Sequence, residues 1–448
     1  MSILFYILIF LVVAIIVTYL LKKYANAKTY LIFSIVKSTK LAEKFDKLKF
    51  GTVWDKLGDF GISLGFGALG LFYLRKGKNK LITILYVLLF FAAFFLVIYF
   101  LAGKSLLDSL LISGIFGLFG FSGIVIYLLI VQTIMLIDLF VAGQAKCVGI
   151  APVIPGVKIP KVPITIPFFE GWIALIIGMV IHEFSHAVLM RKAKVKIKSF
   201  GPLLLGFLPI GAFVEPDEKK LKSISLKDKL RIYASGPAIN IIFAVIVFGL
   251  LLLFGAVTSN YTKTVVANYG EVYIVGADEY GGICGEGGLS KNFGLVDENT
   301  KISSVDGNTI SSLTDFRTQI ISALKDEKQY ISAELEKDQN VFDQNLYFNE
   351  KNVLGISLEQ RYKEGVPFKY KVIGFVSSLL YWIFLLNLLI GIFNFLPVVP
   401  FDGGAMAMSM YSPLFFFVKG EKREKTVMMF FIALVVLLLV LNLIPIFG

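Results

Sequence analysis

The chain has 448 residues, of which 56% are hydrophobic and only 17% are charged. This composition excludes a soluble globular protein and is typical of a polytopic α-helical membrane protein. The net charge of +12 does not indicate nucleic-acid binding, because residues 260–368 hold 10 Lys+Arg against 17 Asp+Glu, whereas the remainder holds 34 against 15. Under the positive-inside tendency, residues 260–368 lie outside the cytoplasm and the basic loops lie inside.

The N-terminal part of the chain is predicted to contain several membrane spans. Ile3–Leu21 is long and lacks a small-residue cleavage site, so it is interpreted as a retained span. Leu57–Leu74 is rich in glycine and either spans the membrane or forms a re-entrant segment. Leu81–Leu101 is a clear span. Leu106–Val141 is too long for one ordinary helix and barely long enough for two, with a break expected in Gly114–Gly123. The number of spans in this part stays open.

The apolar stretch Gly171–Arg191 carries the most informative polar residues, which are His182, Glu183 and His186. One ionisable group at mid-bilayer costs at least about 2.5–3.5 kcal/mol on insertion scales, so three such groups need a partner. Two histidines four residues apart lie on one helix face and suit two ligands of one zinc ion, while Glu183 could deprotonate a zinc-bound water. These are the only two histidines of the chain. The alternative is a pair of hydrogen-bonded core histidines in a transporter or proton path.

The region after this helix contains a hairpin and a further span. Arg191–Lys198 is basic, which predicts that the HEFSH end of the preceding helix faces the cytoplasm. Ser199–Pro216 is apolar but interrupted by Gly and Pro, so we expect a hairpin at the membrane surface or dipping into the site. Arg231–Phe254 is the next span, in which Gly236 permits close helix approach. Asn240 makes either a helix–helix hydrogen bond or a catalytic contact.

Residues 260–368 form the only sizeable soluble part, and a small β-rich domain is predicted there. Thr264–Ala277 alternates as a strand does, and Gly294–Ile310 indicates a strand, a DG turn and a second strand. Ser312–Asp326 is predicted to be a helix with Ser312 as its N-cap. The apolar face of this helix is expected to hold Phe316, Ile320, Ile321 and Leu324.

The two cysteines, Cys147 and Cys284, lie far apart in the sequence. They are therefore interpreted as forming neither a disulfide framework nor a cysteine-type metal site.

The C-terminal part supplies a candidate third metal ligand. Tyr370–Phe393 is a span that runs into NFLPVVPFDGGAMAM, where two prolines and two glycines interrupt the helix at membrane depth. Such backbone is tolerated only where it is packed in protein or lines a cavity. Asp402 would complete a site of two histidines and one carboxylate with a free position for water, the alternative being that it caps the following helix. The last span is Val427–Ile446. The predicted helix directions bring HEFSH and FDGG to the same, cytoplasmic, side.

Three motifs, HEFSH (182–186), SGPAIN (235–240) and NFLPVVPFDGG (394–404), resemble the core-helix motifs of the site-2 protease family of intramembrane zinc metalloproteases in order and spacing. The resemblance covers about residues 150–260 and 370–410. It implies one zinc ion per chain and a PDZ-like domain around Gly294–Ile310. The implied roles are metal ligands for His182, His186 and Asp402, catalytic base for Glu183, and help in holding the substrate for Asn394 and the 199–216 hairpin. Asn240, Pro397 and Gly403 are further expected substrate contacts.

The expected fold is a three-helix metalloprotease core with extra N- and C-terminal spans and a small extracytoplasmic β-rich domain. The predicted divisions are residues 1–145 (N-terminal spans), 146–259 (first part of the core), 260–368 (PDZ-like domain), 369–412 (second part of the core) and 413–448 (last span).

The expected function is cleavage of the transmembrane segments of single-pass or small membrane proteins, in the lipid bilayer of the cell membrane, by a water that zinc and Glu183 activate. No nucleic-acid partner is expected, and the oligomeric state stays open. A metal transporter would show inverted repeats and polar residues along opposing spans, neither of which the sequence contains. An inactive scaffold would have no need of Glu183.

Overall fold

The computed structural model describes residues 3–25, 27–45, 50–101, 103, 105–145, 147–158, 164–277, 279–281, 284–419 and 422–443. The chain forms two compact units, each assembled from three segments. The first unit comprises Met1–Leu129, Gly171–Val247 and Trp382–Val436. The second comprises Ile130–Glu170, Phe248–Tyr381 and Leu437–Gly448.

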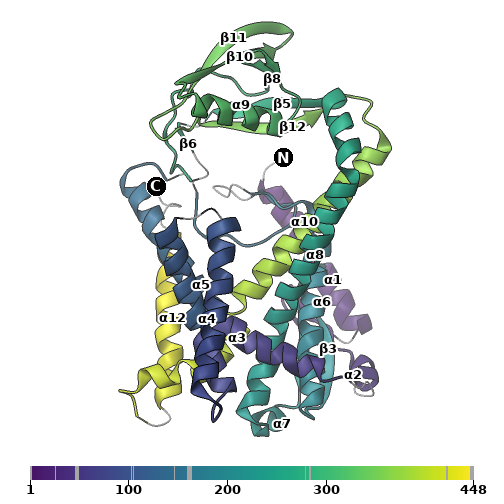
Figure 1. Cartoon of the computed structure of the whole chain (residues 1–448). Coiled ribbons are helices and arrows are strands. Elements are labelled where there is room, and N and C mark those ends of the chain that lie inside the picture. Colours follow the sequence, from purple (N-terminus) through teal and green to yellow (C-terminus); the bar gives the residue numbers. More distant parts are fainter. Residues whose placement is uncertain are drawn as a thin grey trace. The chain divides into compact units, whose positions relative to one another are not determined.

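Seven helices of the described residues are long and apolar enough to cross a membrane, which confirms the predicted polytopic α-helical class (Figure 1). They are α3 (Val53–Leu74), α4 (Lys80–Leu96, continued by a π-helical turn at Val97–Leu101), α5 (Leu106–Val141), α6 (Phe168–Lys192), α8 (Leu226–Tyr269), α10 (Phe368–Phe393) and α12 (Lys422–Asn442). Helix α1 (Ile3–Ala25) covers the first predicted span. The predicted end of the last span, residues 444–446, lies outside the described residues.

Helices α3 and α5 each bend at a glycine, and the two bends pack against each other. Gly67 has φ 52° and Gly120 has φ 62°, in the left-handed region that favours glycine. A Cβ at Gly67 would meet the Gly117 carbonyl oxygen at 2.7 Å, and one at Gly120 would meet the Leu64 carbonyl oxygen at 2.4 Å. The break expected in Gly114–Gly123 is therefore confirmed at Gly120, and both glycines permit backbone-to-backbone packing.

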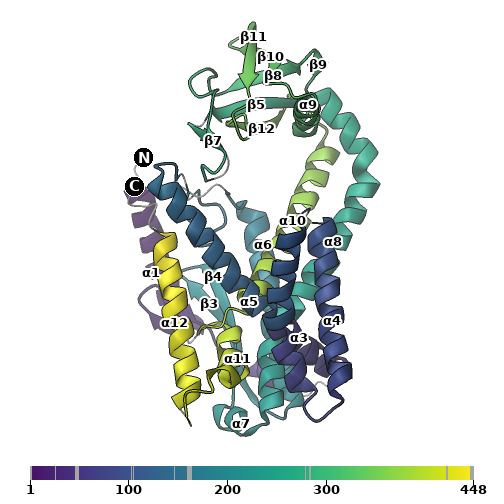
Figure 2. The ribbon, with the colours of Figure 1, turned by 60° about the vertical axis from the view of Figure 1, so that its left-hand side comes forward.

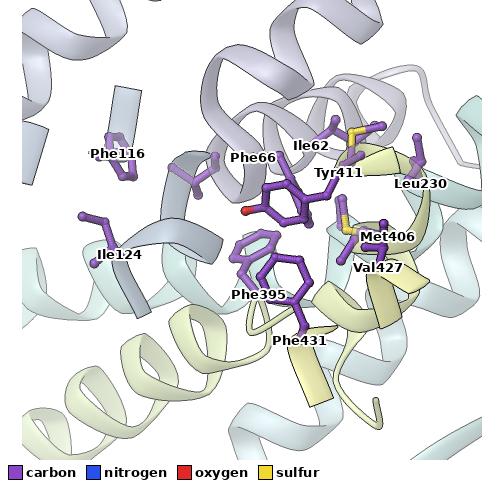
Figure 3. Packing of buried hydrophobic residues seen from close by; sticks show 14 of the residues in the cluster. Ile62, Phe66, Phe116, Ile124, Leu230, Phe395, Met406, Tyr411, Val427 and Phe431 are labelled. Carbon is purple, nitrogen blue, oxygen red and sulfur yellow. The ribbon is translucent and has the colours of Figure 1, made fainter. Parts of the chain in front are cut away.

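The apolar core of the first unit surrounds the segment that follows α10. Figure 3 shows Phe66 of α3, Phe116 of α5 and Phe431 of α12 in the cluster that contains Phe395. Tyr411 lies at the end of α11 (Asp402–Met410), before a 3₁₀ turn at Ser412–Phe415, and its hydroxyl is hydrogen-bonded to Ser122 of α5. The segment between Phe395 and α11 is thus fixed by buried aromatic packing on several helices.

A four-stranded antiparallel sheet in the first unit contains the predicted hairpin. Its strands are β1 (Lys28–Tyr30), β2 (Phe33–Ile35), β3 (Ile197–Leu205) and β4 (Leu208–Pro216), in that order, and Figure 2 shows β3 and β4 side by side. The hairpin expected in Ser199–Pro216 is confirmed, whereas its pairing with two N-terminal strands was not predicted. Helix α2 (Thr39–Phe45) contacts β3, and α7 (Glu218–Ser223) follows β4.

The β-rich region in the second unit consists of an antiparallel sheet with the strand order β11-β10-β8-β5-β12 and helix α9 (Leu313–Lys325). The predicted hairpin at Gly294–Ile310 is confirmed, because β8 and β9 flank a turn at Asp306 and Gly307. The predicted N-cap is also confirmed, since Ser312 Oγ accepts the Asp315 N–H at 3.0 Å. The strand bounds are β5 (Gly270–Ala277), β6 (Tyr280–Gly281), β7 (Gly288–Leu289), β8 (Thr300–Val305), β9 (Asn308–Thr309), β10 (Tyr330–Lys337), β11 (Asn340–Tyr347) and β12 (Ile356–Tyr362).

Two local predictions in this region are wrong. Residues 264–269 are helical, because α8 continues to Tyr269 and β5 begins only at Gly270. Extending a formed helix adds a hydrogen bond for each residue that is fixed, which outweighs the strand preference of Thr264 and the two valines after it. Ile321 is 44% exposed, whereas Phe316 is buried and Ile320 and Leu324 pack on the sheet.

The prediction that the cysteines form no disulfide is also wrong. Cys147 and Cys284, both in the second unit, are joined by a disulfide with a Cα–Cα distance of 4.9 Å. The loops that carry them are in close contact, because a Cβ at Gly285 would meet the Gln144 carbonyl oxygen. A sequence separation of 137 residues does not restrict the distance in the folded chain.

Candidate metal centre

Two histidines of α6 and an aspartate at the start of α11 meet in the first unit. His182 Nε2 lies 3.0 Å from Asp402 Oδ2, and His186 Nε2 lies 3.2 Å from the same oxygen. Potential ligand atoms of the three residues all lie within 4.8 Å of one another, and both histidines are buried. The predicted contact between residues 182–186 and 402, which lie more than two hundred positions apart, is therefore present. Asp402 is not the N-cap of α11, a position that Phe401 occupies.

The other ring nitrogen of each histidine also has a polar neighbour. His186 Nδ1 lies 2.7 Å from the Ile232 carbonyl oxygen, and His182 Nδ1 lies 3.4 Å from the side-chain amide of Asn240. A histidine that binds a metal through Nε2 carries its proton on Nδ1 and donates it to such a neighbour. Asn240 Oδ1 is buried and otherwise unpaired, and a 180° rotation of the amide would direct it at Nδ1. The Asn240 side chain therefore contacts the ring nitrogen of His182 that would not bind the metal.

Gly236 of α8 leaves the space between the two histidines open. A Cβ at this position would lie 2.5 Å from His186 Nε2 and 2.6 Å from His182 Nε2. The sequence indicated only that Gly236 permits close helix packing. Because glycine has no functional group, nothing in the sequence assigned it to the metal site. Its spacing from Asn240, about one helical turn, could have placed it on the same face of α8.

The candidate base, Glu183, lies beside the outer edge of β4. Its side chain is half-buried and lies near the outward-pointing backbone N–H of Val214. The register of the sheet explains this direction. Phe200 of β3 exchanges two backbone hydrogen bonds with Ser38, so its N–H and C=O point away from β4. Its partner Val214 must then also point away from β3, toward the free side of β4.

Peptide groups of an antiparallel strand alternate in direction, and this alternation directs a second peptide group of β4 away from β3. Pro202 accepts a backbone hydrogen bond from Val36, on the side of β3 that faces β2. Ala212, which pairs with Pro202, therefore directs its N–H and C=O outward as Val214 does. Among the described strands, none pairs with this edge of β4. The edge offers main-chain donors and acceptors next to Glu183.

The remaining predicted site residues form the turn that carries Asp402. The side-chain amide of Asn394 donates to the Ile390 carbonyl oxygen at 2.8 Å, and the backbone carbonyl oxygen of Asn394 accepts the Gly403 N–H at 2.7 Å. A Cβ at Gly403 would overlap the backbone of Phe395, and Pro397 is buried. Among the described contacts, none joins Asn394, Pro397 or Gly403 to the histidines. Their contacts support the backbone next to Asp402.

The donor set fits a zinc ion. Two imidazole nitrogens and one carboxylate oxygen are typical ligands of catalytic zinc sites that keep one position open. The space kept free by Gly236 agrees with a metal ligand role for both histidines, and the buried, unpaired Oδ1 of Asn240 agrees with this role for His182.

A family model and a curated protein both match parts of this chain. The model of peptidase family M50 matches residues 170–438, a segment that includes His182, Glu183, His186 and Asp402. Uncharacterized protein MJ0971 of Methanocaldococcus jannaschii is 28% identical over 238 residues, which cover 53% of this chain and 56% of that protein. The chain thus spans about half the length of the curated relative that it matches.

Proposed function

Because the chain belongs to peptidase family M50, whose members are membrane-embedded zinc-dependent metalloproteases, we propose that it cleaves the transmembrane segments of other membrane proteins. The observation that carries this proposal is the convergence of His182 Nε2, His186 Nε2 and Asp402 Oδ2 in one buried cluster beside Glu183. Three ionisable groups in apolar surroundings are costly without a bound partner, and a metal ion removes that cost.

The chain's own residues have separate roles at the site. A zinc ion held by His182, His186 and Asp402 would supply Lewis-acid activation of a water molecule and of the scissile carbonyl group. Glu183 would accept the proton of the attacking water and pass it to the leaving amine. Asn240 and the carbonyl group of Ile232 would keep the two imidazoles in the tautomers that leave Nε2 free to bind.

The edge of β4 is the proposed docking place for the substrate backbone. A transmembrane helix satisfies its own backbone hydrogen bonds, so it must unwind before its carbonyl group can be attacked. The outward peptide groups of Ala212 and Val214 could replace the lost hydrogen bonds if the unwound segment adds to the sheet as a strand. Substrates with helix-destabilising residues near the cleaved bond should therefore be favoured.

We further propose that residues 260–368 lie outside the cytoplasm and that the metal centre faces the cytoplasmic side. The acidic balance of this region and the basic balance of the remainder support this orientation. The disulfide between Cys147 and Cys284 agrees with an oxidising environment on that side. In this position the predicted PDZ-like domain would exclude substrates that carry bulky outer domains.

The deciding experiment uses Glu183→Gln, with purified wild-type chain and Asp402→Asn as references. In proteoliposomes that contain a tagged single-pass membrane protein, we expect Glu183→Gln to retain zinc and to lose cleavage, because only the proton acceptor is removed. Asp402→Asn should lose both zinc and cleavage. Metal analysis and gel electrophoresis of the tagged fragments measure the two quantities. Cleavage by Glu183→Gln at the wild-type rate would refute the proposal.

A further inference from the structure

An ion pair connects α3 to the first turns of α8 close to the metal centre. Arg231 Nε donates to Asp59 Oδ1 at 2.7 Å, and Arg231 Nη2 donates to Asp59 Oδ2 at 2.7 Å. The two side chains are 18% and 33% exposed. A bidentate pair of this kind fixes the orientation of the guanidinium group as well as its distance. One turn earlier on α3, Asp55 pairs with Lys192 at the end of α6 at 3.0 Å.

Helices α3 and α8 pack closely on both sides of this ion pair. A Cβ at Gly58 would meet Arg231 Cβ at 2.8 Å, and one at Gly61 would meet the Ala234 carbonyl oxygen at 2.5 Å. Helix α3 therefore lies directly on residues 231–234 of α8. Small residues permit this close approach of helices in membranes.

The residue between these contacts, Ile232, orients one candidate metal ligand. Its carbonyl oxygen lies 2.7 Å from His186 Nδ1 and also accepts the Ser235 hydroxyl at 2.7 Å. Pro237 follows inside the helix and has no N–H, so the Tyr233 carbonyl group lacks its usual partner four residues later. The series of backbone hydrogen bonds in α8 is thus interrupted just after Ile232. The position of the first turns of α8 therefore depends on contacts with other helices.

We propose that Asp59 and Arg231 are positioning residues of the metal centre. They hold the start of α8 against α3, so that the Ile232 carbonyl group stays behind His186 Nδ1 and His186 Nε2 stays directed at Asp402. This inference rests on the proposed metal site. It gives α3, which precedes the segment matched by the family model, a direct part in organising that site.

The test measures metal binding by the full-length chain in detergent, with Co²⁺ as the probe. The variant Asp59→Asn keeps the size of the side chain and removes its charge. We expect its apparent Kd for Co²⁺, measured in competition with a chromogenic chelator, to rise about 10- to 100-fold, the usual cost of losing outer-shell support. The visible absorption spectrum of bound Co²⁺ should change as well, because the orientation of His186 changes. Asp59→Glu, which restores the charge, should recover part of the affinity.

An ion pair of the second unit provides the control. Lys301 and Glu336 of the second unit are 2.8 Å apart, with side chains that are 23% and 37% exposed. Glu336→Gln removes one carboxylate partner of Lys301, which also lies 3.2 Å from Glu271, and we expect both its Co²⁺ affinity and its Co²⁺ spectrum to match the wild type. A general loss of stability would affect the two variants alike, whereas a positioning role affects only Asp59→Asn.

Arg231→Lys is the second variant, used if Asp59→Asn does not fold, because it keeps the charge and loses the bidentate geometry. The inference is overturned if the folded variant binds Co²⁺ within about threefold of the wild type and with an unchanged spectrum. A wild-type chain that binds no Co²⁺ would instead refute the proposed metal site, and this inference with it.

Discussion

At the scale of single residues, the candidate metal centre depends on Gly236, because this residue has no side chain. The Cβ of any residue other than glycine at position 236 would lie within 2.6 Å of both histidine Nε2 atoms, the atoms through which the histidines would bind a metal. The cluster of the three candidate ligands could be predicted, because ionisable groups in apolar spans need a partner. Gly236 could not, because helix packing explains a glycine equally well.

We predict that Gly236→Ala lowers the affinity for zinc at least about 100-fold while the metal-free chain still folds. The two imidazole rings must move away from the new Cβ, and the preference of a helix for alanine over glycine, about 1 kcal/mol, offsets part of the cost of that movement. Zinc analysis and thermal unfolding of the metal-free chain test this. The control is Gly249→Ala on the same helix, where a Cβ meets no atom within 4 Å. Full zinc content in Gly236→Ala would contradict the prediction.

At the scale of elements, the free edge of β4 follows from pairings that the sequence did not indicate. Gly and Pro residues predicted the hairpin, but β1 and β2 have three residues each, too few to show an alternating pattern. These strands and Ser38 occupy the other side of β3, and this arrangement leaves β4 as the edge beside Glu183.

We predict that Ala212→Pro lowers the rate of cleavage of a membrane substrate about 5- to 10-fold, the equivalent of one lost hydrogen bond. Proline removes the outward N–H of Ala212 and leaves the pairing with β3 in place, since this N–H does not bond to β3. Zinc content should be unchanged. Ala212→Val, which keeps the N–H and adds bulk, serves as control and should cleave at close to the wild-type rate. Equal rates for the proline and valine variants would argue against strand addition at this edge.

At the scale of the whole molecule, the disulfide and the charge distribution both bear on orientation. The charge asymmetry could be predicted from the sequence, whereas the pairing of Cys147 with Cys284 could not, because it depends on how two distant loops fold together. The chain has two cysteines and both are in this bond, so an introduced cysteine is the single free thiol.

We predict that a membrane-impermeant maleimide labels Asp343→Cys in intact cells and labels Lys220→Cys only after the membrane is opened. Both positions are exposed, one on β11 and the other on α7. The proposed orientation puts β11 outside and α7 inside the cell. Labelling of Lys220→Cys in intact cells would contradict this orientation, and labelling of both variants after permeabilisation shows that each thiol can react.

The chain's only two histidines both belong to the candidate metal centre. Nuclear magnetic resonance of a chain carrying ¹⁵N only in its imidazole rings would therefore contain signals from this centre alone, without background from the rest of a large membrane protein. The chemical shifts of the four ring nitrogens distinguish protonated, unprotonated and metal-bound atoms. Such a spectrum would report the tautomer of each ring, the arrival of the metal and any disturbance of the Ile232 and Asn240 contacts directly.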